Sequence, residues 1–531
     1  MNPASTQPKR LRSPRLILLT AGLLLACAAS AQPAVTPTPA PGSTDVRWLQ
    51  RATFGIDSAS LASYRQLGRQ RWLDAQLADH DDTLPPAISA LIASYPAVST
   101  PPEELLDKEA EARRQLKAMP DGDAKVAAKK DLQKQSRELA QQAQQAELLH
   151  AIYGSNPLKE QIVWFWLNHF SVYAAKGRVR LVAADYEEHV IRPHALGKFR
   201  DLLLATLKSP AMLEFLDNAK NVKGKTNENY ARELMELHTL GVGSGYTQQD
   251  VQQLALILTG AGIAPKTPRR FERAGRGRFG HQQAAVMREG LFVFNPQKHD
   301  FSDKVLFGQR IRGRGYEEIE QALQLITRQP ACAQFVSRQL AEYFVADQPP
   351  PTLVDAMAKT FKQTDGDIAA VLRTMFDSPE LLADNAKKFK DPTQFLVSAM
   401  KLTYDGQPIS NAQPLVNWLN QMGEPVFGRI TPDGWPVDGA SWSGSGQMAS
   451  RFEVARAIGS GRNKLFMVDS PENAAADTPR QRPIAPAMDT ALYHAVIEPY
   501  LSESAKVALG KAATVAEWNT YLLSSPDFNY R

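Results

Sequence analysis

Apolar residues recur with helical spacing along most of the chain from Asp45 onward. Two long polar stretches rich in Ala, Leu and Gln, residues 102–119 and 124–150, are separated by Pro120-Asp121-Gly122-Asp123, a sequence typical of a tight turn. We expect them to form an antiparallel helix hairpin that projects from the fold as an arm at 102–150. Its dense charges fit a solvated face with i,i+4 pairs, and partner binding is the alternative.

A second group of helices is apolar enough to be buried. Trp164, Phe165 and Trp166 point in three directions around a helix over 158–170, which only a buried helix accommodates. Thr247-Gln248-Gln249-Asp250 has the spacing of a capping box at the start of another helix. The same reasoning predicts further helices at 183–191, 198–208 and 210–217, and from Tyr316 to the end apart from a Gly/Ser/Trp-rich loop at 428–446.

The β-strand signal is short. Gly290–Phe294 and Lys304–Phe307 are apolar runs separated by a turn, and we expect them to pair as a hairpin. The sequence therefore predicts a mainly α fold. It consists of one large single helical domain, residues 45–528, with a small β-hairpin and a projecting antiparallel helix hairpin.

The first 31 residues have the organisation of a secretory signal peptide. Basic residues precede an apolar run from Leu16 to Ala28, and Ala29-Ser30-Ala31 is a small-x-small cleavage site. The run is shorter than the roughly 20 residues that a membrane-spanning helix needs. Residues 32–44 are rich in Pro, Ala and Thr and are expected to be a flexible linker. We expect export to the periplasm or the extracellular space, with membrane attachment only if the protein is lipidated at Cys27.

Composition and charge exclude several classes of protein. The 531 residues include 61 basic and 56 acidic ones and are 43% hydrophobic, values of an ordinary globular protein. Cleavage after Ala31 removes four basic residues and leaves 57 against 56, a net +1, so a general electrostatic attraction to nucleic acid is not expected. The mature chain keeps a single cysteine, Cys332, and no internal disulfide can form. Its helical context predicts a buried, unreactive thiol.

The most informative stretch runs from Asn227 to Gly241. At about 100° per residue, Asn229, Arg232, Glu233 and Glu236 fall within one quarter of the helix circumference. Paired Glu side chains can act as general acid and base, with an arginine keeping one of them ionised, or can bind a metal with a remote histidine. The alternative is an amphipathic helix whose Arg/Glu stripe is solvated and self-paired.

Histidines elsewhere can assist these carboxylates. His169 shares a helix face with aromatic residues, so it is either a buried, hydrogen-bonded histidine or an assisting group. His299 and Asp300 lie in the predicted hairpin turn, where they can ligate a metal or relay a proton, although an Asx turn explains Asp300 equally well. Gly275–Gly280 matches G-x-G-x-x-G without the apolar strand that a dinucleotide site needs. The sequence therefore assigns no metal and no cofactor.

A series of segments in a fixed order resembles the bacterial family catalogued as domain of unknown function 1800. Besides the 227–241 stretch, these segments are Arg51–Gly55, Trp164–Phe170, His194–Leu203, Pro210–Leu213, Leu216–Asn218, His299-Asp300 and Gly434–Pro436. The resemblance implies an exported protein with no established reaction, and a genomic neighbour similar to sulfatases and alkaline phosphatases. Asp217 and Trp435 fall within these segments, and we expect them, with Asn229, to contact a substrate. Residues 428–435 depart from the usual family pattern.

Three functional hypotheses follow. The first is a periplasmic hydrolase-like enzyme of unidentified substrate, whose catalytic residues are Glu233, Glu236, Arg232, His169, His299 and Asp300. The alternative is a non-catalytic binding or assembly partner of the neighbouring sulfatase-like protein, with the arm as the contact. A third possibility is that the basic loop Arg269–Arg278 recognises an anionic glycan or phosphate.

Overall fold

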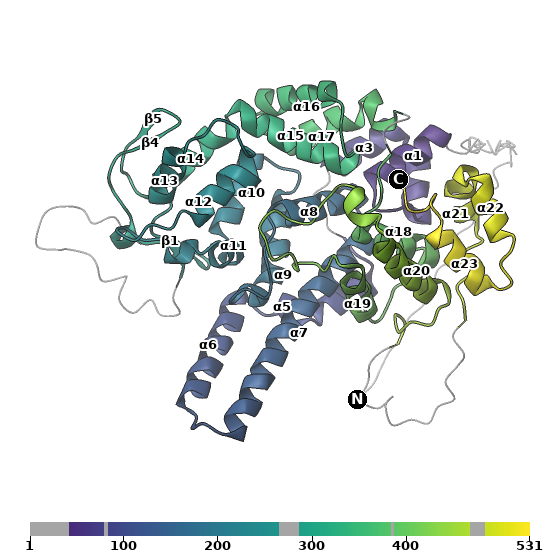
Figure 1. Cartoon of the computed structure of the whole chain (residues 1–531), viewed down its shortest axis with the longest axis horizontal. Helices are drawn as coiled ribbons and strands as arrows, with labels where there is room; N and C mark the ends of the chain where they lie inside the picture. Colours follow the sequence, from purple (N-terminus) through teal and green to yellow (C-terminus); the bar gives the residue numbers. More distant parts are fainter. Residues whose placement is uncertain (1–41, 79–82, 265–285, 384–386, 468–483) are drawn as a thin grey trace, which may run out of the picture. The chain divides into compact units, whose positions relative to one another are not determined.

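The computed structural model describes residues 42–531 except 79–82, 265–285, 384–386 and 468–483 (Figure 1). The predicted signal peptide, most of the predicted linker and the basic loop Arg269–Arg278 lie outside the described residues. The described residues belong to one compact unit. Their secondary structure is mainly helical with two small sheets, which confirms the predicted fold class.

The described chain begins with short helices that bury aromatic side chains. The first helix starts at Ser43, two residues before the predicted start of the domain. Trp48 packs with its ring centre 5.9 Å from Tyr64 and 5.6 Å from Phe376, and its indole donates a hydrogen bond to the Phe376 carbonyl. These contacts join the start of the domain to residues more than 300 positions later. The elements are α1 (Ser43–Ala52), α2 (Ser58–Leu67), α3 (Arg69–Ala78), α4 (Pro86–Ala93) and α5 (Pro96–Ser99).

The predicted helical arm is present. Helices α6 (Pro102–Ala118) and α7 (Asp123–Tyr153) run antiparallel on either side of a short turn (Figure 1). Buried residues in α6 are confined to its first half, and apart from Ser136 those of α7 begin at Ala143. The base of the hairpin is therefore part of the core, and its distal turns are solvated.

Helix α8 (Pro157–His169) is the buried helix that the aromatic pattern predicts. The Asn156 side chain caps it by accepting a 2.9 Å hydrogen bond from the Lys159 amide, and every residue from Pro157 to Leu167 is buried. Burial on all sides places this helix inside the core. It is followed by η1 (Val179–Leu181), α9 (Ala183–Asp185), the π-helix η2 (Tyr186–Ile191), η3 (Arg192–His194), α10 (Phe199–Lys208), α11 (Pro210–Phe215) and η4 (Asn218–Lys220).

The helix that carries the candidate carboxylates is not a regular α-helix. Helix α12 (Asn229–Glu233) continues into a π-helical segment, η5 (Leu234–Thr239). The Leu240 amide donates to the Met235 carbonyl, five residues earlier, at 2.8 Å. Regular α-helical spacing would turn Leu237 toward the core, but the wider turn buries Met235 and leaves Leu237 half-exposed. The predicted capping box is confirmed at the start of the next helix, α13 (Gln248–Ile257).

The predicted pairing of the two β segments is wrong, because they belong to different sheets. Gly290 has φ +54° and makes a tight turn that joins β3 to β2, while Phe307 and Gly308, with φ +51° and +74°, join β4 to β5. Each tight turn pairs its strand with its nearest neighbour in sequence. All pairs are antiparallel, in the order β1-β3-β2 and β4-β5, with bounds β1 (Ala261–Ile263), β2 (Met287–Glu289), β3 (Phe292–Phe294), β4 (Lys304–Leu306) and β5 (Gln309–Ile311).

Helices return at Tyr316, as predicted. Cys332 in α15 is fully buried, as predicted, and burial raises the pKa of its thiol. No helix of the described residues is long and apolar enough to cross a membrane. The remaining elements are η6 (Pro296–Lys298), α14 (Tyr316–Thr327), α15 (Pro330–Phe344), α16 (Pro351–Gln363), α17 (Ile368–Phe376), η7 (Pro379–Leu382), α18 (Pro392–Tyr404), α19 (Gln413–Met422), η8 (Ala440–Trp442), α20 (Ser445–Gly459), α21 (Ala491–Val496), η10 (Glu498–Tyr500), α22 (Glu503–Leu509) and α23 (Val515–Ser524).

Candidate functional site

The polar quartet predicted on the 227–241 helix does share one face. Asn229 is exposed, and Arg232, Glu233 and Glu236 are half-buried. On the apolar side, Tyr230, Leu234 and His238 are buried. The two carboxylates are therefore reachable from solvent without being fully solvated.

Glu233 and Glu236 lack a partner within the described part of the chain: neither side chain forms a hydrogen bond or an ion pair there. Burial raises the pKa of Glu233, and the negative charges of Glu236 and Asp433 raise it further. Asp433 lies about 200 residues later in the loop before Trp435 and is held by Arg429 at 2.7 Å. The fold thus brings three carboxylates together, one of which the sequence did not identify.

Arg232 does not pair with the two carboxylates as predicted. Its guanidinium lies 3.2 Å from the Glu228 carboxylate and donates to the Gln248 side chain at 2.9 Å. Its positive charge lowers the pKa of Glu233, but burial and the neighbouring carboxylates outweigh that effect. Glu233 therefore retains a proton to higher pH than an ordinary glutamate.

Tyr246 connects the carboxylates to a cavity. Burial raises the pKa of its phenol, and the charges of Glu236 and Glu233 add to that shift. Tyr246 also lines a cavity of about 480 Å³ together with Asp250, Phe307 and Gln329. The phenol of Tyr246 therefore lines a space that can hold a small molecule and also feels the charges of the two carboxylates, which do not line that space themselves.

The Trp435 loop is fixed against the end of α8. The Asn168 side chain accepts a 2.6 Å hydrogen bond from the Trp435 amide and donates to its carbonyl at 2.9 Å. Gly434 has φ +73°, and a Cβ there would lie 2.3 Å from the Asn168 carbonyl oxygen, so only glycine fits. The Trp435 indole donates to the Pro425 carbonyl at 3.3 Å. These contacts place the loop, and with it Asp433, beside the carboxylate helix.

His169 contacts the π-helical segment η5 that carries Glu236. Its Nε2 donates a 3.0 Å hydrogen bond to the carbonyl of His238 in η5, and Phe165 and Phe170 pack against the ring. Burial lowers the pKa of His169 to about 4 and that of His238 to about 3, so both imidazoles are neutral at physiological pH. His169 is half-buried, and its hydrogen bond joins the end of α8 to η5, as in the hydrogen-bonded alternative.

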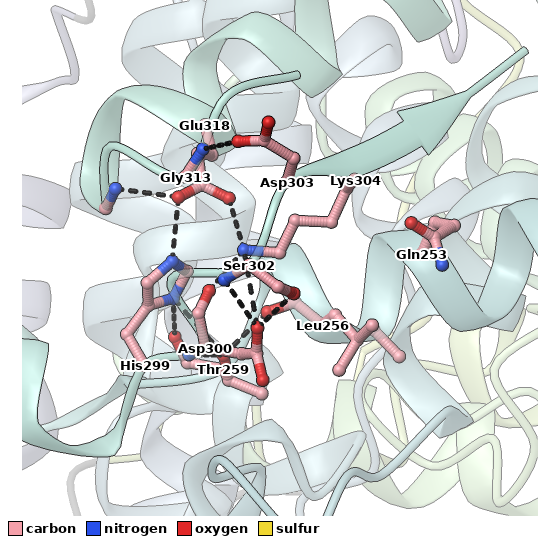
Figure 2. A network of polar contacts seen from close by, with 12 residues as sticks. Gln253, Leu256, Thr259, His299, Asp300, Ser302, Asp303, Lys304, Gly313 and Glu318 are labelled. Atoms are coloured by element: carbon pink, nitrogen blue, oxygen red, sulfur yellow. Dashed lines mark hydrogen bonds and ion pairs between the residues drawn. The ribbon is translucent and has the colours of Figure 1, made fainter. Parts of the chain in front are cut away.

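His299 and Asp300 belong to a separate polar network, shown in Figure 2. The fully buried His299 ring bonds through Nε2 to Glu318 at 2.9 Å and through Nδ1 to the Thr259 carbonyl at 2.8 Å. Lys304 is also fully buried and pairs with Glu318 at 2.6 Å. Although burial opposes it, the hydrogen bonds from His299 and Lys304 lower the pKa of Glu318.

Asp300 accepts from the Ser302 amide at 2.8 Å, which is the predicted Asx turn. None of the hydrogen bonds or ring contacts of His299 and Asp300 involves residues 229–239. The structure therefore does not bring this pair to the carboxylates, and it places both residues in an internal network that joins α13, the β4 segment and α14.

Asp217 and Asn229 shape the turn before α12. Asp217 adopts φ +60° and pairs with Lys176 at 2.8 Å and with Lys220 at 2.7 Å. The Asn229 side chain donates to the Leu216 carbonyl at 3.2 Å. Their contacts are those of residues that order a turn. No group of three or more His, Cys, Asp or Glu side chains in the described ranges has a geometry that could hold a metal ion.

The family model described as a protein of unknown function, DUF1800, matches residues 47–530. The chain belongs to the DUF1800 family. No curated protein and no solved structure matches the chain.

Three of the segments that suggested the DUF1800 family from the sequence lie together at the carboxylate helix. The end of α8 contributes Asn168 and His169, η5 contributes Glu236, and the late loop contributes Trp435. The loop at 428–433, where this chain departs from the usual DUF1800 pattern, supplies Asp433 and its partner Arg429. Membership in the family supplies no reaction.

Proposed function

We propose that this DUF1800 protein is a hydrolase-like enzyme in which Glu233 acts as a general acid and Glu236 as its partner carboxylate. The observation that carries the proposal is the unpaired, half-buried Glu233, whose pKa is raised by burial and by Glu236 and Asp433. Structural carboxylates are usually paired when they are buried, and catalytic acids are tuned in this direction. The Tyr246 cavity offers the adjoining space for a substrate.

The role of each side chain in this proposal follows from its surroundings. The raised pKa of Glu233 favours its protonated form, which can give a proton to a leaving group, and the Tyr246 phenol, whose pKa is also raised, can donate a hydrogen bond to a developing negative charge. Asp433 is locked by Arg429 and adds negative potential that sustains the raised pKa of Glu233. Asn168 holds the loop at Trp435 and His169 holds η5, so both segments are fixed to the end of α8.

Glu233→Gln and Glu236→Gln test the proposal against a panel of chromogenic esters, glycosides, phosphate esters, sulfate esters and peptides. Both variants should lose activity toward whichever substrate the wild-type protein turns over. Because the Glu233 side chain has no hydrogen-bond or ion-pair partner to lose among the described residues, Glu233→Gln should also leave the melting temperature unchanged or raise it. Glu214→Gln is the matched control, since Glu214 is half-buried but paired with Arg178 at 3.1 Å.

The control should lower the melting temperature and retain full activity. Activity that survives in both carboxylate variants would show that these residues do not catalyse a reaction. A loss of stability in Glu233→Gln comparable with that of Glu214→Gln would identify Glu233 as a structural residue.

A second candidate function is that of a binding or assembly partner of a neighbouring sulfatase-like protein, with the arm as the contact. The solvated outer half of the α6–α7 hairpin favours it, because so long a hairpin adds little to the core. Co-purification of the two proteins should then depend on the arm, and unaltered co-purification of an arm-deleted chain would contradict this function.

We also propose export to the periplasm or the extracellular space, on the charge and apolar pattern of residues 1–31. The mass of the mature protein distinguishes cleavage after Ala31 from lipidation at Cys27.

A further inference from the structure

One side of the helical arm carries a groove with an excess of positive charge. A cavity of about 550 Å³, here called the arm groove, lies between α6, α7 and the segment that leads into η1. Its charged lining consists of Arg113 and Lys117 from α6, Lys125 and Lys129 from α7, Arg180 from η1, and one carboxylate, Glu109.

Helical spacing explains why these side chains gather. On α6, residues 109, 113 and 117 recur every four positions, and on α7, residues 125 and 129 do the same, so each set follows one face. Because the two helices run antiparallel, the two faces form opposite walls of one groove. Arg180 closes the end nearest the core.

The positive charges of the arm groove are only partly neutralised. Glu109 pairs with Arg113, and Asp121 pairs with Lys125 at 2.8 Å. Lys117 and Lys129 form no hydrogen bond or ion pair with the described residues. Arg180 donates to the Ala175 carbonyl at 2.9 Å, but its Nε is buried and has no partner among the described residues. Three cations therefore remain available to an anionic ligand.

The base of the arm groove is apolar. Leu116 and Leu132 are half-buried, Leu181 is buried, and all three line the cavity between the cationic walls. A site for a simple polyanion needs only the cations. An apolar floor between two cationic walls instead matches a peptide that places an apolar side chain between carboxylates.

We propose that the arm groove binds an acidic segment of a partner polypeptide. Carboxylates of the segment pair with Lys117, Lys129 and Arg180, and an apolar side chain contacts Leu116 and Leu132. The inference deepens the second candidate function, because it assigns the chemistry of the partner, and it is independent of catalysis at Glu233.

The full mature protein is titrated into a fluorescein-labelled synthetic helical peptide with Glu and Leu on one face, and anisotropy is followed. The double variant Lys117→Glu/Lys129→Glu should weaken binding about tenfold or more, which corresponds to about 1.4 kcal/mol. Lys130→Glu/Lys134→Glu is the matched control, because both lysines are exposed on α7, outside the groove lining, and the net charge change is the same. The control should stay within about twofold of wild type, and binding should weaken as salt rises.

Two further ligands test whether the arm groove prefers the peptide to other anions. Replacing the peptide's Leu residues by Ala should weaken binding several-fold, and a heparin oligosaccharide of similar charge should bind more weakly than the peptide. The proposal is overturned if the peptide does not bind, if both double variants weaken binding equally, or if heparin binds as tightly as the peptide. The activity of the Glu233→Gln variant is measured in a separate assay, so the catalytic proposal and the peptide-binding proposal can fail independently.

Discussion

At the scale of single residues, Lys390 is a buried lysine whose ammonium contacts no carboxylate among the described residues. Its ammonium is buried, lies 3.0 Å from the Ser398 hydroxyl and stands 3.9 Å from the centre of the Phe528 ring. Burial lowers the pKa of Lys390 to about 7, and the positive charges of Arg531 and Arg451 contribute. A cation without a carboxylate partner in the core disfavours the folded state.

Lys390→Met should therefore stabilise the protein at low pH. The unfolded lysine binds its proton up to about pH 10.5, whereas the folded one releases it near pH 7, so the stability of the wild type rises with pH across this window. The variant should raise the free energy of unfolding at pH 6 by up to about 4 kcal/mol, and the gain should shrink toward pH 10. Urea denaturation at the two pH values measures the difference.

Lys401→Met provides the contrast, because buried Lys401 is paired with Asp57 at 2.7 Å. This change should destabilise the protein at both pH values. A stabilising effect of both substitutions would mean that hydrophobicity alone, and not the missing partner of Lys390, explains the gain.

The candidate site could be predicted from the sequence only where it is local. Helical spacing was enough to place Glu233 and Glu236 on one face, and the aromatic neighbours of His169 were enough to raise the buried alternative. Asp433 was missed because it lies in an aperiodic loop about 200 residues away, and loop positions carry no spacing signal. Tyr246 was missed for a similar reason: a turn, and not a helix face, brings it to the cavity.

At the scale of elements, α7, α8 and η2 meet around a buried arginine. Arg192 bonds to both oxygens of Glu160, at 2.9 and 3.0 Å, and to Glu187 at 2.8 Å. Glu147 of α7 is also buried beside it, with the nearest atoms 3.7 Å apart. More carboxylates than cations surround the guanidinium, so the helices hold together only if some of the carboxyl groups keep a proton.

This cluster should make stability fall as pH rises. Burial raises the pKa of Glu147 to about 7 and that of Glu187 well above its ordinary value. The folded state then keeps protons that the unfolded chain releases near pH 4.5, so the stabilisation is full below that pH and is lost through about pH 7. Glu147→Gln, which mimics the protonated form, should be more stable than wild type at pH 8 and show a flatter profile from pH 5 to 8 in thermal unfolding.

Glu160→Gln is the control for the Glu147→Gln variant. It removes the carboxylate that holds Arg192 most directly, so it should destabilise the protein by about 3 kcal/mol or more at every pH. If Glu147→Gln lost as much stability at pH 8 as Glu160→Gln, Glu147 would have to be ionised in the folded protein.

Element prediction succeeded for long amphipathic helices and failed for short elements. The bounds of α6, α7 and α8 follow the predicted ranges within a few residues, because many apolar positions define each helix. The π-helical segments were not foreseen, since a hydrogen bond to the fifth preceding residue changes the spacing without changing composition. The strands have three residues each, too few for alternation to specify a partner, and the turns at Gly290 and Gly308 decide the pairing instead.

At the scale of the whole molecule, the described unit is held by contacts between distant parts of the chain. The buried Arg51 side chain donates to the carbonyls of Phe344 and Val345, and Gln161 of α8 bonds to Gln394 of α18 at 2.9 Å. The family match likewise runs from residue 47 to residue 530. The outer half of the arm takes no part in such contacts.

The outer arm should therefore be removable without loss of the fold. Replacement of residues 111–138 by a short Gly/Asn turn keeps the buried Leu105 and Leu106 of α6 and the buried residues of α7 from Ala143 onward. Because the deleted side chains are almost all solvated, the melting temperature should change by only about 2–4 °C, the effect of roughly 1 kcal/mol. Binding of the acidic peptide should disappear, since both walls of the arm groove are lost, while activity that depends on Glu233 should persist. Circular dichroism, peptide anisotropy and substrate turnover on one preparation check the three expectations. Loss of the cooperative unfolding transition would mean that the arm stabilises the core, and peptide binding that survives the deletion would place the acidic-peptide site elsewhere.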